Sequence, residues 1–257
     1  SSYGTGGLIG QVYGATTIEN CGVGGTVKNT GTGYSGVYIG GLVGYQYDAL
    51  TMTDCYCAAT VTSSSTSSTS AAGGLVGKGG GYAVSAENCY ASGDVTTQGG
   101  YAGGFIGYGY ASYSKPHNYV NCYAAGTVIG KTPYGFTYNY NSSYCTIQNC
   151  YYNSANATGY NGDAEGLTAK SSDELKGLAS MLGSAYQDDT TDLNNGYPIL
   201  CWQYIDPEAT ADVTLTVEPA DSILTWNGQQ QAVSEDGTYT FSGVETGKYA
   251  YRVTNET

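Results

Sequence analysis

Positive charge and long apolar runs are both scarce in this sequence of 257 residues. Charged residues make up 11% of it, with eight Lys and Arg residues against 21 acidic ones, a net charge of −13 and a single histidine. Because phosphate backbones are held mainly by Lys and Arg, the chain is not expected to bind nucleic acid. No apolar run approaches the roughly 20 residues that span a bilayer, so we expect no membrane contact within the chain.

A secretion signal and a cell-wall anchor are not recognisable either. The sequence starts at a repeated motif and stops after a strand-like segment. We therefore expect it to be a fragment of a larger protein, whose signal and anchor lie outside these residues.

Glycine, with 40 residues, and tyrosine, with 28, are abundant. A chain rich in Tyr and β-branched residues favours an all-β fold over disorder. The acidic residues are unevenly placed, since residues 161–257 hold sixteen of the 21 and residues 1–160 hold five. This shift indicates a change of module, and we expect one domain over residues 1–205 and a second over residues 206–257.

Two short motifs recur with a common period in the first part of the chain. The first is Gly-Gly-apolar-apolar-Gly, whose starts are 34, 33 and 30 residues apart, with a weaker fifth copy. The second is Asn-Cys or Asp-Cys, whose cysteines are 34, 34, 33 and 28 residues apart. The copies of the first motif are Gly6–Gly10, Gly40–Gly44, Gly73–Gly77, Gly103–Gly107 and the weaker Tyr134–Tyr138.

Each repeat is short, rich in β-branched residues and bounded by glycine, which predicts strands and turns rather than helices. Such units bury their apolar side only by stacking, so we predict a parallel β-helix, or β-solenoid, of about five coils spaced roughly 4.8 Å apart. The Leu or Phe after each Gly-Gly pair would form an inner column. The glycines would mark corners that need a positive φ or a close backbone approach.

The second motif predicts two ladders along the solenoid. Cysteines about 4.8 Å apart with parallel Cβ vectors are poorly placed for a disulfide, so we favour a buried column of thiols. The Asn or Asp side chains before them would hydrogen-bond along a corner. The ladder residues are Cys21, Cys55, Cys89, Cys122 and Cys150 with Asn20, Asp54, Asn88, Asn121 and Asn149, whereas Cys57, Cys145 and Cys201 lie off the ladder and their pairing stays open.

These paired motifs resemble the GLUG motif, which is named for its Gly-Leu-apolar-Gly core. The GGLIG of Gly6–Gly10, the NCYASGDV of Asn88–Val95 and the GYPIL of Gly196–Leu200 are similar to the sequence in and around that motif. The resemblance covers roughly residues 4–204. It implies an extracellular repeat region of a bacterial surface protein, with an adhesive or structural role and no chemistry.

One helix is predicted, over about residues 172–186. Ser171 and Glu174 match a capping box, and the apolar residues that follow them recur at helical spacing. Because an open solenoid end exposes strand edges, we expect this helix and a strand over residues 196–203 to close the C-terminal end of the solenoid.

The last part of the chain, residues 206–257, has a different pattern. Short runs of alternating apolar and polar residues are separated by turn sequences such as Asp236-Gly237. This pattern predicts a small antiparallel β-sandwich. It resembles the Ig-like or PEGA-like modules of bacterial surface proteins.

No arrangement typical of catalysis is recognisable. His117 is the only histidine, and we expect it in a loop. Glu19 and Glu87 share a repeat position, but Thr53 lies between them, which gives poor support for paired-carboxylate chemistry. The stretch Asp188–Gly196 has the composition of a calcium loop but departs from the EF-hand pattern, so we favour an ordinary loop. We expect no catalytic residue, no metal and no cofactor.

Tyrosines are the candidate ligand-binding residues. Those that follow the ladder cysteines should point outward where the cysteines point inward, so replacing Tyr90 should cost less stability than replacing Cys89. Rows of exposed rings can bind a glycan or a protein, or they can stack along the solenoid and stiffen it. The candidates are Tyr56, Tyr90, Tyr123 and Tyr151 after the ladder, with Tyr108, Tyr110 and Tyr113 in the fourth coil.

Of three functions that fit this pattern, we favour a non-catalytic adhesin or stalk segment. It would be extracellular, on the bacterial cell surface or secreted, and monomeric, with a host or microbial surface glycan or protein as its partner. The first alternative is a carbohydrate-binding module that uses the Tyr-rich face. The second is a glycan-cleaving β-helix enzyme, which would need converging carboxylates.

Overall fold

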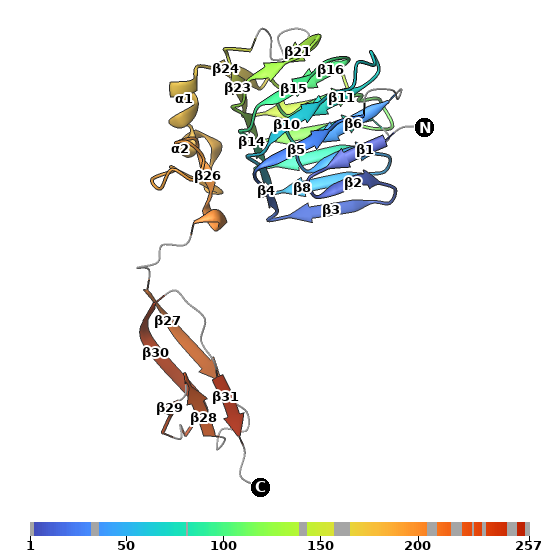
Figure 1. Ribbon diagram of the computed structural model, residues 1–257. Coiled ribbons are helices and arrows are strands. Elements are labelled where there is room, and N and C mark those ends of the chain that lie inside the picture. Colours follow the sequence, from blue (N-terminus) through green and yellow to red (C-terminus); the bar gives the residue numbers. More distant parts are fainter. Residues whose placement is uncertain are drawn as a thin grey trace. The chain divides into compact units, whose positions relative to one another are not determined.

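The computed structural model describes residues 3–31, 36–80, 82–138, 143–156, 165–204, 210–216, 223–227, 229–232, 235–245 and 251–254 (Figure 1). The chain divides into two compact units, Ser1–Cys201 and Trp202–Thr257. The first unit is a parallel β-solenoid, which confirms the predicted fold class. No helix in the described ranges is long and apolar enough to cross a membrane.

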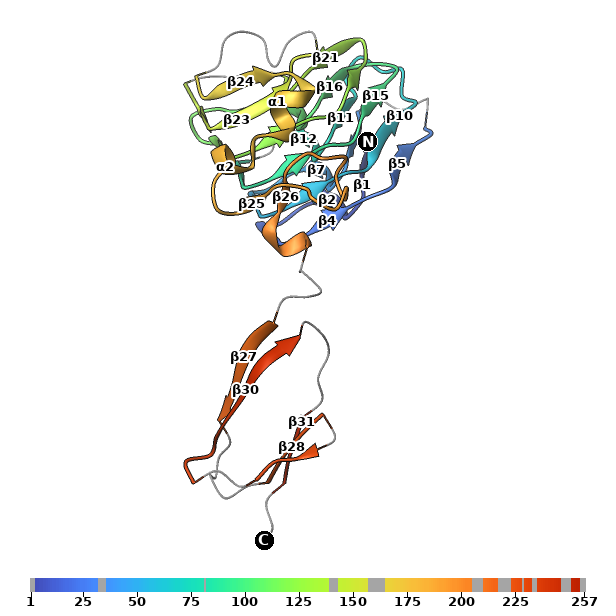
Figure 2. The ribbon, with the colours of Figure 1, turned by 90° about the vertical axis from the view of Figure 1, so that its left-hand side faces the viewer.

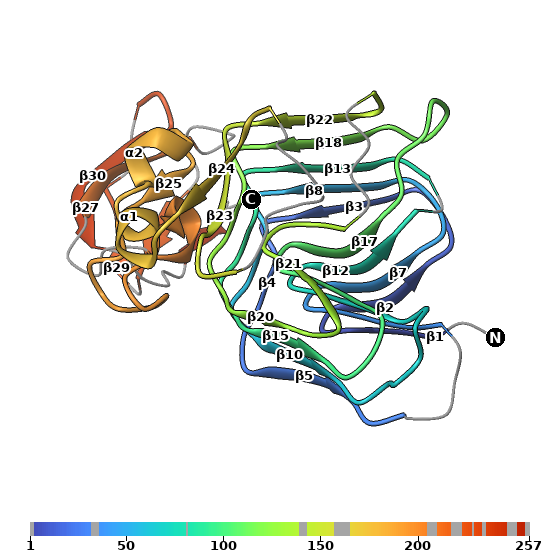
Figure 3. The same ribbon diagram turned by 90° about the horizontal axis from the view of Figure 1, so that it is seen from above.

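In the described part of the chain, five parallel sheets run along the solenoid, each built of strands from successive coils, as the end-on view of Figure 3 shows. Sheet A contains β1 (Tyr3–Gly6), β6 (Val37–Gly40), β11 (Ala71–Gly73), β16 (Tyr101–Gly103) and β21 (Thr132–Tyr134). Sheet B contains β2 (Ile9–Val12), β7 (Val43–Gln46), β12 (Val76–Gly79) and β17 (Ile106–Gly109).

The three other sheets complete each coil. Sheet C contains β3 (Thr16–Glu19), β8 (Leu50–Thr53), β13 (Val84–Glu87), β18 (His117–Val120) and β22 (Cys145–Gln148). Sheet D contains β4 (Gly22–Val23), β9 (Tyr56–Cys57), β14 (Tyr90–Ala91), β19 (Tyr123–Ala124), β23 (Cys150–Asn153) and β24 (Leu167–Lys170). Sheet E contains β5 (Thr26–Asn29), β10 (Thr60–Ser63), β15 (Val95–Thr97) and β20 (Val128–Ile129).

The Gly-Gly pair of each repeat forms the turn between sheets A and B. A Cβ atom on Gly41 would lie 2.1 Å from the Sγ of Cys57 and 2.1 Å from the carbonyl oxygen of Gly74 in the next coil. Neither contact is sterically possible, so the turn requires glycine for close backbone approach. The positive φ that we also considered is not the reason, because Gly41 is not among the residues with positive φ.

The apolar residue after each Gly-Gly pair forms the predicted inner column. Leu42, Leu75, Phe105 and Phe136 are fully buried, whereas Leu8 in the first coil is 48% exposed. The rings of Phe105 and Phe136 stack with their centroids 4.6 Å apart. Since Phe136 lies in Tyr134–Tyr138, that weaker sequence is a structural fifth copy of the motif.

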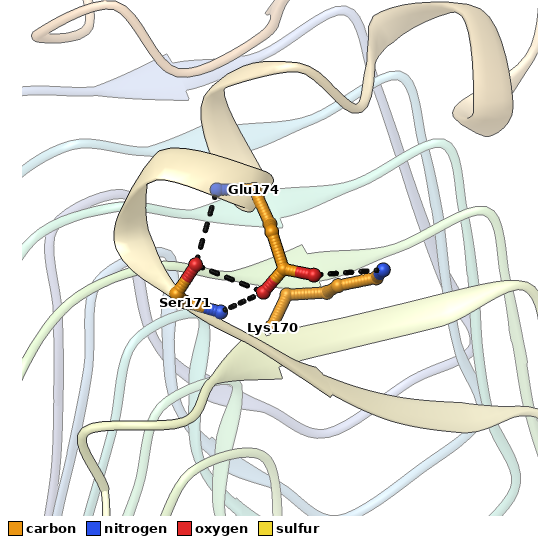
Figure 4. Close-up of polar contacts among 3 residues, drawn as sticks. All are labelled: Lys170, Ser171 and Glu174. Carbon is orange, nitrogen blue, oxygen red and sulfur yellow. Dashed lines mark hydrogen bonds and ion pairs between the residues drawn. The ribbon is translucent and has the colours of Figure 1, made fainter.

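After the last coil, the chain forms α1 (Ser172–Lys176), α2 (Ala179–Leu182), β25 (Tyr186–Gln187), β26 (Ile199–Leu200) and the 3-10 helix η1 (Cys201–Gln203). The predicted single helix over 172–186 is therefore two short helices, because Gly177 ends α1. The strand expected over 196–203 is confined to β26. The predicted capping box is present, with the Glu174 N–H donating to Ser171 Oγ and the Ser171 N–H donating to Glu174 Oε2 (Figure 4).

This segment, residues 171–200, covers the side of the solenoid and not its end, so we call it the lateral cap. In Figure 2 its helices lie in front of the sheets. Its apolar residues pack on the tyrosines of sheet D to form a second core, separate from the one inside the coils. The expectation that it closes the C-terminal end was wrong, because its apolar residues pack on the tyrosine face of sheet D.

In the second unit, the described strands form two small antiparallel sheets. One pairs β27 (Thr210–Thr216) with β30 (Thr238–Glu245), and the other joins β29 (Gln229–Gln230), β28 (Ile223–Trp226) and β31 (Tyr251–Thr254). Leu224 and Tyr239 are buried between them, and the rings of Trp226 and Phe241 stack at 4.6 Å.

Candidate binding site

The ladder cysteines lie in one column inside the coils. Cys55, Cys89, Cys122 and Cys150 are fully buried, and Cys21 in the first coil is partly buried. Each thiol donates to a nearby carbonyl; Cys89 Sγ, for example, lies 3.2 Å from the carbonyl oxygen of Glu87. Because these four thiols are fully buried, they are shielded from reagents in solution.

The cysteines off the ladder lie in different surroundings. Cys57 and Cys145 are buried, and Cys201 is exposed. Burial raises the pKa of the Cys57 thiol to about 12. Of these three, only Cys201 is accessible enough to react with a reagent in solution.

The residues before the ladder cysteines form a chain of side-chain hydrogen bonds. Asn88 Nδ2 donates to Asp54 Oδ1 at 2.9 Å, Asn121 to Asn88 at 3.2 Å, and Asn149 to Asn121 at 2.9 Å. All of these residues, and Asn20, have a φ between 49° and 53°. Asn and Asp tolerate this left-handed conformation better than other non-glycine residues. The column of Asn and Asp residues therefore has two structural functions: its side chains link successive coils, and its backbone forms a sharp corner in each coil.

The tyrosines that follow the ladder cysteines are not an exposed row, which corrects the prediction from the sequence. Tyr90 and Tyr123 are fully buried, Tyr151 is 6% exposed and Tyr56 is half-buried. They point out of the coil, as expected, but the lateral cap packs over them. Tyr123 is also held by polar contacts, since its hydroxyl accepts a hydrogen bond from Asn194 Nδ2 at 2.9 Å.

The three candidates of the fourth coil lie in two different settings. Tyr110 and Tyr113 are well exposed near the loop that follows β17. Tyr108 is half-buried on β17 and lines a cleft.

This cleft lies between sheets A and B and has a volume of about 280 Å³. Sheet A contributes Tyr38 and Tyr101, and sheet B contributes Lys78 and Tyr108, while Thr69 lies at its rim. We call these five residues the tyrosine–lysine cleft. The strand register accounts for it, because Lys78 pairs with Tyr45 on one side and with Tyr108 on the other.

Lys78 is surrounded by aromatic rings. Its Nζ lies 4.5 Å from the ring centre of Tyr38, 5.1 Å from that of Tyr45 and 5.5 Å from that of Tyr108, and it donates to Tyr38 Oη at 3.1 Å. Cation–π contacts of this kind favour a half-buried ammonium. Burial and the hydroxyl of Tyr47 raise the pKa of Tyr45, so this ring stays neutral at pH 7.

Further tyrosines extend the cleft along the solenoid axis. Tyr101 and Tyr138 stack with their centres 4.1 Å apart, and Tyr134 lies 5.2 Å from Tyr138. On the other side of Lys78, Tyr45 lies 4.1 Å from Tyr47, which stacks on the exposed Tyr13 at 5.0 Å. The result is a row of rings across several coils with one cation near its middle.

Sequence reasoning missed most of this row, although a signal was present. Tyr45, Lys78 and Tyr108 each follow the last glycine of a Gly-Gly-apolar-apolar-Gly motif. Tyr38 and Tyr101 each lie two residues before such a motif. Because the motif is the turn between sheets A and B, residues on its two sides meet across that turn.

A second, more polar cleft of about 450 Å³ lies between the solenoid and the lateral cap. It is lined by Asp94, Thr127, Asn153 and Tyr197, among others. The Asp94 carboxylate accepts a hydrogen bond from the backbone N–H of Thr127 at 2.8 Å, which ties it to the next coil.

His117 and the Asp188–Gly196 stretch, which were also considered from the sequence, make contacts that stabilise the fold. His117 lies in strand β18 and not in a loop, where burial lowers its pKa to about 4 and its Nδ1 lies 2.8 Å from Tyr119 Oη. In the Asp188–Gly196 stretch, Asp189 accepts backbone hydrogen bonds from Leu193, Asn194 and Gly196. Within the described ranges, no three His, Cys, Asp or Glu side chains are grouped to hold a metal ion.

Comparison with known proteins identifies the repeat. Residues 1–28 match the family model of the GLUG motif, so the chain contains this motif. A search of curated proteins finds no match. Among solved structures, the chain is similar to a protein from Bacteroides ovatus described as a "putative immunoglobulin A1 protease", at 24% identity and a TM-score of 0.49. The similarity covers 72% of this chain and 57% of that one, so the chain spans little more than half of its length.

Proposed function

We propose that this chain is a non-catalytic segment of an extracellular bacterial surface protein, where it acts as an adhesin or stalk. The observation that supports this best is the continuous parallel register of all five sheets. Every coil is tied to the next by backbone hydrogen bonds, and the Asn column adds side-chain bonds in the same direction. Such a stack is suited to present a surface at a fixed position.

The distribution of carboxylates supports a non-catalytic role over glycan cleavage. In the strand register, Glu19 and Glu87 pair with opposite sides of Thr53, so their backbones are about 10 Å apart. Both side chains are exposed, and neither lines either of the two clefts described above, where a substrate would have to be enclosed. In the larger cleft, the only carboxylate among the lining residues is that of Asp94.

Turnover on a panel of pectins, glucans and host glycans tests this proposal. We expect no product above background for the wild-type chain or for Asp94→Asn. Activity that Asp94→Asn abolishes would overturn the adhesin assignment in favour of a glycan-cleaving enzyme. Protease treatment of intact cells that express the full-length protein tests its location, and resistance of the segment in intact but not in lysed cells would argue against a surface position.

The second candidate is a carbohydrate-binding module, and the tyrosine–lysine cleft is the observation that favours it. Aromatic rings bind the apolar faces of sugars, and Tyr adds a hydroxyl for hydrogen bonding. A glycan array probed with the intact chain tests this candidate. Binding that is lost in Tyr101→Ala but kept in Tyr113→Ala would support it.

A further inference from the structure

We infer that the tyrosine–lysine cleft binds an acidic sugar, with the anionic group of the sugar on Lys78 and its ring against the tyrosines. This inference deepens the proposed function, since it rests on the chain being a binding segment. It starts from the partners of the Lys78 side chain. A half-buried ammonium is commonly paired with a carboxylate, but Lys78 has no such partner among the described residues, where the only ion pair is Lys170–Glu174.

The hydrogen bonds of Lys78 leave donor capacity for a ligand. An ammonium group has three N–H donors. In the described part of the chain, one of them is used, in the bond to Tyr38 Oη. Because the Tyr38 oxygen accepts this bond, its own O–H proton is directed elsewhere and can also be donated. An anionic oxygen in the cleft would therefore meet a cation and a hydroxyl donor together, and such charge-assisted hydrogen bonds are the strong ones.

The shape and the aromatic lining select a sugar over a simple anion. The volume of about 280 Å³ is just below the range of about 300–1,000 Å³ that is typical of ligand pockets, which suits one sugar ring. Tyr101 and Tyr108, with ring centres 5.1 Å apart, offer apolar surface beside Lys78. A small anion would leave that surface unused, whereas a sugar ring covers it. The row of tyrosines to both sides would accommodate neighbouring units of a longer chain.

The charge around the cleft does not oppose an anion. Although the chain as a whole carries −13, residues 1–160 hold five acidic and four basic side chains and are nearly neutral. None of those five carboxylates is among the residues that line the cleft.

Isothermal titration of the intact chain with three oligosaccharides of matched length tests the inference. An oligogalacturonide supplies carboxylates, a sulfated galactan supplies sulfates, and a galactan supplies neither. We expect at least one acidic oligosaccharide to bind about tenfold or more tightly than the neutral one, as one charged hydrogen bond predicts. Which of the two binds more tightly identifies the anionic group, and the preference should shrink as salt is raised.

Three variants test whether the preference for the acidic sugar depends on Lys78. Lys78→Gln should remove the preference for the acidic sugar, and Lys78→Arg should keep it. Lys115→Gln is the matched control, because Lys115 is also half-buried and lies 5.3 Å from the ring centre of Tyr82, yet it does not line the cleft. Circular dichroism and thermal melting would establish that each variant is folded.

The inference is overturned if the neutral sugar binds equally well, if Lys78→Gln keeps the preference, or if neither acidic sugar binds at millimolar concentration. Equal binding of the neutral sugar would leave the adhesin proposal intact. The turnover and surface-exposure experiments decide that proposal separately.

Discussion

Replacing Tyr90 by Ser should destabilise the solenoid more than replacing its neighbour Cys89 by Ser. Tyr90 is fully buried between the rings of Tyr56 and Tyr123, at 5.2 and 4.9 Å, and beneath the lateral cap. Removal of a buried aromatic ring costs about 3–5 kcal/mol of unfolding free energy, from lost burial and from the cavity that remains. In Cys89→Ser, the hydroxyl can still donate to the carbonyl of Glu87, so we expect a loss of about 1–2 kcal/mol.

Urea unfolding of the intact chain, followed by far-ultraviolet circular dichroism, measures both changes. Tyr113→Ser serves as the control, because Tyr113 is 88% exposed and its replacement should change the free energy by less than about 0.5 kcal/mol. A cost for Tyr90→Ser no larger than that for Tyr113→Ser would refute the docking of the lateral cap on sheet D. It would restore the exposed tyrosine row that the sequence alone had predicted.

Three further predictions concern the turn, the corner and the cap. Gly41→Ala should prevent folding or lower the urea midpoint strongly, whereas Gly14→Ala, where a Cβ meets nothing within 4 Å, should fold normally. Asn88→Ala should be less stable than Asn88→Gly by about 1–2 kcal/mol in urea unfolding, because both lose the ladder bonds but only Ala is strained at a φ of 50°. Burial opposes ionisation of Asp189, but backbone N–H groups outweigh it and lower the pKa, so this carboxylate stabilises its loop above about pH 4 and the effect is lost as pH falls. The protection factors of the loop amides, which are their exchange rates corrected for the pH dependence of intrinsic exchange, should therefore fall in acid, and Asp189→Asn should remove that dependence; equal protection factors at neutral and acid pH would contradict it.

The period of the repeat made the solenoid predictable. A fixed spacing between two motifs means that equivalent residues stack, and this is what the register shows, with Glu19, Thr53 and Glu87 in one row. The capping box of Ser171 was also predictable, because it depends on residues three apart in the sequence. Both features follow from local or periodic patterns.

Contacts that cross the repeat were not predictable in the same way. Burial of Tyr123 depends on Leu175 and Leu178, which lie outside the repeat, and no period links the two segments. The tyrosine–lysine cleft depends on how sharply the Gly-Gly turn brings sheets A and B together. The close approach of Gly41 to Cys57 and Gly74 at that turn is visible only once the coil is closed.

The two tyrosine rows of the solenoid therefore differ in what packs against them. The apolar residues of the lateral cap pack on the row that contains Tyr90, whereas the row around Lys78 lines a cleft. The glycines of the motif are fixed by backbone contacts, but the position after the last glycine is not, since it is Gln11, Tyr45, Lys78 and Tyr108 in successive coils. Substitutions there change the chemistry of the cleft while leaving the turn intact. For the binding function proposed above, the residues after the motif, and not the motif itself, are therefore where specificity should be sought.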